Sequence, residues 1–238
     1  MGVGNASRGR SVVVRRRAFV RCRVGDACRT KAVLPPSVDQ GRFVGGQVVN
    51  VAADTIVTER LLLRPLVPGG ADAEHLVHYK QRFYAAFKPW WPAQDPSRFT
   101  LMEQEALLEQ FARDRAEDRR YAFGLFVRSS DDLAGRVHLN NVVRGAFHSA
   151  DAGYDIAPPW RGQGLMTEAL GAVLGWATSE IRLHRMQAAV IPRNAASLAV
   201  LRHHGFERIG IAPQYLKIDG CWQDHVLLQK LLYQEEPS

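Results

Sequence analysis

Apolar and polar residues change their pattern near residue 50 of the chain. Residues 1–50 show no sustained period of two or of 3.6 residues, and glycines, prolines and arginines interrupt their short apolar runs. From residue 55 onward, apolar residues recur at the spacings of strands and helices. We therefore predict a mostly disordered extension at residues 1–50 and one folded domain at residues 55–232.

Strand-like and helix-like segments alternate in the middle of this domain, and hairpin-like pairs of strands lie at both ends. Strands are predicted at residues 55–66, 121–127, 134–142, 150–156, 185–191, 206–218 and 222–231. Helices are predicted at residues 72–87, 99–118, 162–178 and 194–204. This order predicts an α/β fold in which one mixed sheet is flanked by helices.

Local signals define the ends of several of these elements. Asp72 is expected to cap the first helix, and Gly205 is expected to end the last helix in a left-handed conformation. The pair Asp219-Gly220 predicts a tight hairpin between the two final strands. In the second helix, Leu101 is counted among the apolar positions.

The net charge of +7 belongs to the extension rather than to the domain. Residues 1–50 hold ten Lys and Arg against two Asp, and the rest of the chain is close to neutral. The longest uncharged apolar runs, such as residues 48–53, are too short to span a bilayer, so no membrane association is predicted. Three cysteines are too few for a disulfide scaffold. Cys22 and Cys28 have no partnering Cys or His pair at metal-ligand spacing, so no metal site is predicted.

The extension at residues 1–50 admits several interpretations. Arginines interrupt every apolar run, which argues against a secretory signal. The segment is rich in arginine and poor in acidic residues, as organelle transit peptides are, but it holds few serines. It could also be a mistaken extension of the true start. Clustered arginines can neutralise phosphates, so a contact with RNA or the ribosome is a further hypothesis.

The first chemical feature is a glycine loop before the third helix. Arg161-Gly162-Gln163-Gly164 follows a predicted strand, and a helix begins directly after it. Two such glycines let the backbone bring several N–H groups to one point, where the helix dipole also favours an anion such as a pyrophosphate. The loop matches neither a Walker loop nor a dinucleotide fingerprint. Taken alone, it could equally be a tight turn that starts a helix.

Several blocks of sequence carry a resemblance to a known family. They are TERLLLR at 58–64, NNVVRGAFH at 140–148, Gly153-Tyr154, RGQGLMTEAL at 161–170 and YLKIDGCWQDHVL at 215–227. In this order they resemble the GNAT superfamily of N-acetyltransferases, and most closely its ribosomal-protein-alanine N-acetyltransferases of the RimJ/RimL type, RimJ branch. The resemblance covers about residues 55–232. It implies a GNAT fold with a single mixed, mostly antiparallel sheet, and acetyl-coenzyme A as the cosubstrate.

The resemblance also implies roles for individual residues. A bulged strand at about residues 154–157 should splay from its neighbour and admit the pantetheine arm. The residues expected to bind the coenzyme are Tyr154, Ile156, Ala157, Arg161, Gly162, Gln163, Gly164, Leu165, Met166 and Asn194. Ser197 and Tyr215 are the candidates for protonating the leaving thiolate, and Trp90 and Trp91 for lining the acceptor groove.

Each of these roles has a structural alternative. Asn194 and Ser197 suit the start of a helix, where Asn is a common N-cap. Tyr215 can simply pack in a strand, and the tryptophans can form a lid over the core. Glu168, one turn into its helix, is expected to be structural because a carboxylate there favours the dipole.

The chemistry of acetyl transfer narrows the substrate. An amine attacks a thioester only when it is neutral. An α-amine with a pKa of about 7.7–8 is about one-tenth neutral at pH 7, whereas a lysine near 10.4 is neutral only about 0.04% of the time. This chemistry favours an N-terminal α-amine over a lysine as the substrate. The resemblance implies a cytoplasmic enzyme that acetylates the N-terminal Ala or Ser of a ribosomal protein, and we expect it to act by direct attack. The alternatives are acetylation of a small amine, such as an antibiotic or a polyamine, and an RNA- or ribosome-binding protein that uses residues 1–50.

Overall fold

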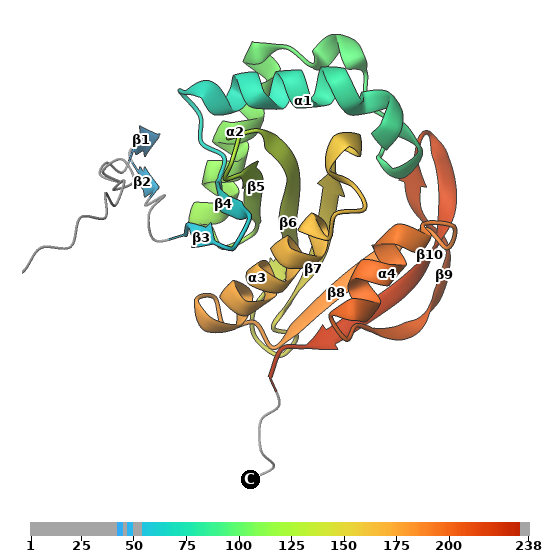
Figure 1. The fold of residues 1–238 in the computed structure, drawn as a ribbon. Coiled ribbons are helices and arrows are strands. Elements are labelled where there is room, and N and C mark those ends of the chain that lie inside the picture. The colour runs from blue at the N-terminus through green and yellow to red at the C-terminus, as the bar shows by residue number, and fades with distance from the viewer. Residues whose placement is uncertain (1–41, 45–46, 50–53, 234–238) are drawn as a thin grey trace, which may run out of the picture. The chain divides into compact units, whose positions relative to one another are not determined.

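A computed structural model gives the fold of the chain and describes residues 42–44, 47–49 and 54–233. The main sheet has eight strands in the order β3-β4-β5-β6-β7-β8-β10-β9 (Figure 1). Their bounds are β3 Ile56–Val57, β4 Leu61–Pro65, β5 Tyr121–Val127, β6 Leu133–Val143, β7 Ser149–Ile156, β8 Arg185–Val190, β9 Glu207–Ile218 and β10 Cys221–Leu231. All neighbours are antiparallel except β7 and β8. The predicted mixed, mostly antiparallel sheet is therefore confirmed.

Helices cover both faces of this sheet. The α-helices are α1 Ala71–Phe87, α2 Leu101–Ala116, α3 Leu165–Ser179 and α4 Ala195–His203, and the short 3-10 helices are η1 Lys88–Trp90, η2 Pro96–Arg98 and η3 Pro158–Trp160. Residues of α3 and α4 pack with one set of strand residues, including Phe123 and Leu125. Residues of α1 and α2 pack with the alternating set, including Ala122 and Phe126. The period of two along β5 thus assigns its side chains to two separate cores.

The sheet opens between its two parallel strands. β7 and β8 pair only from Ser149 to Asp151, and beyond that point β8 pairs with β10 alone. Since Ala157 donates its N–H to Ala134 on the β6 side at 2.8 Å, the alternation of the backbone leaves the N–H groups of Tyr154 and Ile156 facing the opening. The predicted splay of this strand is confirmed.

The predicted bulge, however, lies elsewhere. The register of β7 against β6 runs without interruption from Asp151 to Ile156, and its shift falls between Asn140 and Val143 on β6. Asn141 has a φ of +50° there, so the irregularity is taken up by β6. The prediction of a bulge at residues 154–157 was therefore wrong, and the gap comes from the early end of β7–β8 pairing.

Two other local predictions need correction. The single strand predicted at 55–66 is two short strands. In the turn between β3 and β4, the Thr58 hydroxyl donates to the Leu61 carbonyl oxygen and accepts the Leu61 N–H. Asp72 does not cap α1. Gly70 is the N-cap, and the Asp72 carboxylate instead pairs with Arg64.

The predicted hairpin and helix ends are confirmed elsewhere. Asp219 and Gly220 have φ values of +46° and +78° between β9 and β10. Gly205 follows α4 with a φ of +72°. Leu101, counted above among the apolar positions of the second helix, is 49% exposed at the start of α2 and does not contribute to the core.

Only part of the predicted extension lies within the described residues. There, β1 Arg42–Val44 and β2 Gln47–Val49 form an antiparallel pair, in a range where the sequence pattern predicted no regular structure. The remainder of residues 1–50 lies outside the residues that the structure describes.

Candidate active site

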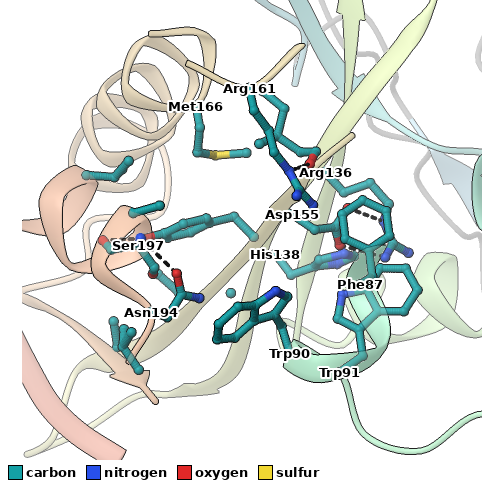
Figure 2. Close-up of a pocket in the computed structure, with 18 of the residues that line it drawn as sticks. Phe87, Trp90, Trp91, Arg136, His138, Asp155, Arg161, Met166, Asn194 and Ser197 are labelled. Carbon is teal, nitrogen blue, oxygen red and sulfur yellow. Dashed lines mark hydrogen bonds and ion pairs between the residues drawn. The ribbon is translucent and has the colours of Figure 1, made fainter. Parts of the chain in front are cut away.

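A cavity of about 730 Å³ follows the opening between β7 and β8. Residues from the start of α3, from β7 and β8, from the start of α4 and from the segment after α1 line it. Figure 2 shows Asn194 and Ser197 on one side of the cavity, with Phe87, Trp91, Arg136 and His138 on the other. The cavity therefore joins the glycine loop to an aromatic end through the middle of the sheet.

The glycine loop forms one end of the cavity. Gly162 and Gly164 have φ values of +71° and +77°, and a Cβ at Gly162 would meet nothing within 4 Å. Gly164 is the N-cap of α3, and no side chain caps that helix start. The free N–H groups of the first turn and the helix dipole thus face space that Leu165 and Met166 line. This geometry suits an anion such as a pyrophosphate.

Glu168 and Arg60 hold the loop in place. The Glu168 carboxylate accepts hydrogen bonds from the Thr58 hydroxyl at 2.6 Å, from the Arg60 N–H at 2.9 Å and from Arg60 Nε at 2.7 Å. Arg60 Nη1 also donates to the carbonyl oxygen of Gln163 at 2.7 Å. Burial by itself would raise the pKa of Glu168, but these hydrogen bonds outweigh it and lower the pKa. The contacts support the structural role expected for Glu168.

Tyr154 and Ser197 are in direct contact in the cavity wall. The Tyr154 Oη atom lies 2.9 Å from Ser197 Oγ and 3.2 Å from the Ser197 carbonyl oxygen. Burial raises the pKa of Tyr154 to about 12, so its proton is retained at physiological pH. Asn194 Oδ1 accepts the N–H of Ser197 at 3.2 Å and also lines the cavity. Asn194 is thus both a helix cap and a cavity residue.

A buried ion pair forms the opposite end. Arg136 on β6 donates to Asp155 on β7 through Nη2 at 2.7 Å and Nε at 3.3 Å, and each side chain is only 8% exposed. Tyr79 on α1 donates its hydroxyl to Asp155 at 2.6 Å. Lys80 lies near this group, and burial together with the charge of Arg136 lowers its pKa to about 8. Both oxygens of the Asp155 carboxylate are therefore engaged.

Aromatic rings cover this ion pair. The rings of Phe87 and Trp91 stack with centroids 4.5 Å apart, and the Arg136 guanidinium lies 5.1 Å from the Trp91 centroid. The carbonyl oxygen of Trp91 accepts the Asp219 N–H at 2.9 Å, so the β9–β10 hairpin is fastened to the aromatic segment. Trp90 lines the cavity beside Trp91 (Figure 2).

The structure brings most of the predicted residues to the cavity. Those that line it are Trp90, Trp91, Tyr154, Ile156, Arg161, Gly162, Gly164, Leu165, Met166, Asn194 and Ser197. Arg161 has its Nε engaged by the Ile156 carbonyl oxygen at 3.0 Å.

Three predicted residues are not brought to the cavity. Tyr215 is 45% exposed on β9, outside the cavity lining, so it is not placed to protonate a thiolate there. Ala157 is fully buried in the core. Gln163 turns away, since its side chain donates to the Pro159 carbonyl oxygen at 2.8 Å. These corrections follow from the direction of each side chain, which spacing in the sequence does not give.

Sequence reasoning missed the polar group at the aromatic end. Tyr79 lies on α1, whereas Arg136, His138 and Asp155 lie on the consecutive strands β6 and β7. One signal was present, because a charged residue inside each of two otherwise buried strands needs a partner. The sequence did not show that Arg136 and Asp155 are paired in register or that Tyr79 on α1 reaches them.

Neither a metal site nor a membrane-spanning helix is found in the part of the chain that the structure describes. No group of three or more His, Cys, Asp or Glu residues in that part could hold a metal ion. None of its helices is long and apolar enough to cross a bilayer.

A mixed sheet that opens between two strands beside a glycine loop and a helix start defines a class of acetyltransferase fold. A profile of the acetyltransferase (GNAT) domain matches residues 60–207. The chain belongs to this GNAT acetyltransferase family, and the predicted resemblance is confirmed.

Similar proteins share most of the domain. The [Ribosomal protein uS5]-alanine N-acetyltransferase of Escherichia coli K12 is 36% identical over 178 residues, which cover 75% of this chain and 91% of that protein. The structure of ribosomal-protein-S5-alanine acetyltransferase from Vibrio fischeri has a TM-score of 0.71 and 30% identity, covering 77% of this chain and 99% of that one. Mycobacterium smegmatis RimJ, solved in complex with CoA-disulfide, has a TM-score of 0.69 and 29% identity, covering 75% and 87%.

Proposed function

We propose that this GNAT enzyme transfers acetyl from acetyl-coenzyme A to the N-terminal α-amine of a protein, Ala or Ser of a ribosomal protein. One observation carries the proposal. A single cavity passes through the sheet from an uncapped helix start to an aromatic end. The named activities of the similar proteins from Escherichia coli and Vibrio fischeri support the substrate class.

The residues at the loop end fit coenzyme A. The open space beside Gly162 and the first turn of α3 would hold its pyrophosphate, with Arg161 at the loop to add a cationic contact. The gap beyond Asp151 would admit the pantetheine arm. When bound, acetyl-coenzyme A supplies the thioester, and the N–H groups of Tyr154 and Ile156 face the space where its carbonyl oxygen would lie.

The aromatic end of the cavity, where the acceptor amine would bind, favours a neutral amine. Arg136 and Lys80 place positive charge there, and the one carboxylate of the described lining, Asp155, is already paired. Positive surroundings disfavour an ammonium ion, which lowers the pKa of an entering amine. The free energy needed to deprotonate an α-amine is modest under these conditions, whereas the free energy needed to deprotonate a lysine amine is far larger.

The residues at the reacting centre support direct attack. Cys221 lies exposed at the start of β10 and outside the cavity lining, so it is not placed to carry the acetyl group. If the Tyr154 hydroxyl donates a hydrogen bond to Ser197 Oγ, the Ser197 hydroxyl can in turn point its own hydrogen at the leaving sulfur. As the amine nitrogen forms the new C–N bond and the C–S bond breaks, Ser197 would stabilise the leaving thiolate, and the proton lost by the nitrogen would pass to solvent water.

The same charges argue against a polyamine substrate. A site for a polycation needs free carboxylates, and the described cavity lining holds only the paired Asp155. We test the proposal with an Ala-initiated peptide and its N-blocked, lysine-containing twin, incubated with acetyl-coenzyme A and examined by mass spectrometry. Acetylation of the first peptide alone is expected. Acetylation of the blocked twin alone would reject the proposed substrate.

We also propose that residues 55–232 carry the activity and that residues 1–50 are an accessory segment that contacts RNA or the ribosome. The ten basic residues of the segment suit a phosphate backbone. Deletion of residues 1–50 should leave peptide acetylation unchanged and weaken RNA binding in a filter or polarisation assay. Loss of peptide acetylation after the deletion would contradict this division of roles.

A further inference from the structure

His138 occupies a distinctive place at the aromatic end of the cavity. It lies on β6, and its ring meets Phe111 edge to face with centroids 5.6 Å apart. Its cross-strand neighbour on β7 is Gly153, which has no side chain to cover the imidazole. The ring therefore lines the cavity beside Arg136 and Trp91 (Figure 2).

Within the part of the chain that the structure describes, no residue hydrogen-bonds to this ring. Among residues 54–233, no hydrogen bond involves either ring nitrogen of His138, whereas the other cavity histidine, His225, contacts the Gln223 carbonyl oxygen through Nδ1 at 2.9 Å. Neither nitrogen is among the buried unpartnered side-chain atoms of the described residues, so the ring opens to the cavity that His138 lines. A substrate group that enters the cavity can therefore reach the imidazole and hydrogen-bond to it.

The surroundings keep this imidazole uncharged. Burial, followed by the charge of Arg136, lowers the pKa of His138 to about 3, with Arg120 and Lys80 adding to the effect and Asp155 opposing it. A neutral imidazole has one nitrogen that accepts a hydrogen bond and one that donates. With so low a pKa it is a weak base, so it holds a substrate N–H without removing the proton.

We propose that His138 accepts a hydrogen bond from the substrate α-amine and thereby directs the nitrogen lone pair toward the thioester carbon. This inference rests on the proposed function and extends it by one substrate-contacting residue. A neutral amine has two N–H groups and one lone pair, so fixing one N–H restricts where the lone pair points. Orientation of this kind contributes directly to the rate of a group transfer.

The test compares kcat/KM for the Ala-initiated peptide in three variants of the full chain. His138→Leu removes the acceptor and is expected to lower kcat/KM about tenfold, the effect of one lost hydrogen bond. His138→Gln keeps an acceptor oxygen and should recover most of the activity. His78→Leu changes an exposed histidine on α1 and should behave as the wild type. Calorimetry with coenzyme A and thermal melts establish that each variant is folded.

Three results would overturn the inference. Full activity of His138→Leu would show that the ring makes no substrate contact, and equal impairment of His138→Gln would show a packing role. A shifted midpoint of the kcat/KM profile with pH in His138→Leu would show that His138 takes the proton, because the midpoint is otherwise set by the substrate amine. If the wild type acetylates only the blocked twin, the proposed function fails. The ratio of the kcat/KM values of His138→Leu and His138→Gln, measured on that twin, still tests the role of His138.

Discussion

Removal of the negative charge at Asp155 should destabilise the fold strongly. Asp155→Asn keeps the size of the side chain but leaves the Arg136 guanidinium without its counter-ion, and both side chains are only 8% exposed. Tyr79 would also lose its charged acceptor at 2.6 Å. Breaking a buried ion pair by changing one partner costs about 3–5 kcal/mol, because the remaining charge stays buried.

This cost is large enough to measure by two methods. For a domain of this size, each kcal/mol lowers the melting temperature by about 2–4 °C, so Asp155→Asn should melt roughly 6–20 °C below the wild type. Urea unfolding followed by tryptophan fluorescence gives the free energy of unfolding independently. The two measurements should agree if unfolding is two-state.

Glu103→Gln is the matched control. It makes the same change from carboxylate to amide in the pair between Glu103 and Arg98, whose side chains are 35% and 68% exposed. Exposed pairs contribute about 0–1 kcal/mol, so the control should melt close to the wild type. If Asp155→Asn were as mild as this control, the reasoning that burial sets the cost of the lost partner would be refuted.

Three further predictions concern the glycine loop and the contact between Tyr154 and Ser197. Gly164→Ala should cost about 1 kcal/mol of stability and weaken coenzyme A binding in calorimetry, because Gly164 has a φ of +77°. Because the folded pKa of Glu168 is lowered, its carboxylate stabilises the fold above its ordinary pKa, and this stabilisation is lost as the pH falls through the folded pKa. The gap in melting temperature between the wild type and Glu168→Gln should therefore be full at pH 7 and should narrow as the pH falls below the ordinary pKa of a glutamate, and a gap that is constant with pH would contradict the assignment. Tyr154→Phe and Ser197→Ala should each lower kcat roughly tenfold. The double variant should lose little more kcat than either single variant, because the two hydroxyls share one hydrogen bond. If the two losses in kcat multiplied in the double variant, the two residues would act independently and this reasoning would be wrong.

Much of the architecture could be predicted from local patterns. The hairpin at Asp219-Gly220, the end of α4 at Gly205 and the loop at Gly162 and Gly164 all require positive φ, which depends on the residue itself and its immediate neighbours. The cap of α4 by Asn194 is equally local. Such features are encoded within a few residues, so a single sequence is enough to find them.

Long-range pairing limited what could be predicted about the site. The period of two along a strand shows which residues share a face, but not whether another element covers that face. Tyr215 was therefore expected in the cavity, whereas β9 is the outer strand of the sheet and leaves it exposed. Asp72 suited a helix cap by position, but Arg64 on the neighbouring strand takes its carboxylate.

The sequence by itself determined the glycine loop, the cap of α4 at Asn194 and the hairpin at Asp219-Gly220, because backbone sterics and capping act over a few neighbouring residues. Only the tertiary structure decided the chemistry of the aromatic end of the cavity, where Tyr79, Arg136, His138 and Asp155 meet from three elements. Burial in that setting suppresses the charge of His138 and ties Asp155 to Arg136. The free energy of a charge depends on the distance to its partners and on the solvent removed around it, and both are properties of the folded chain.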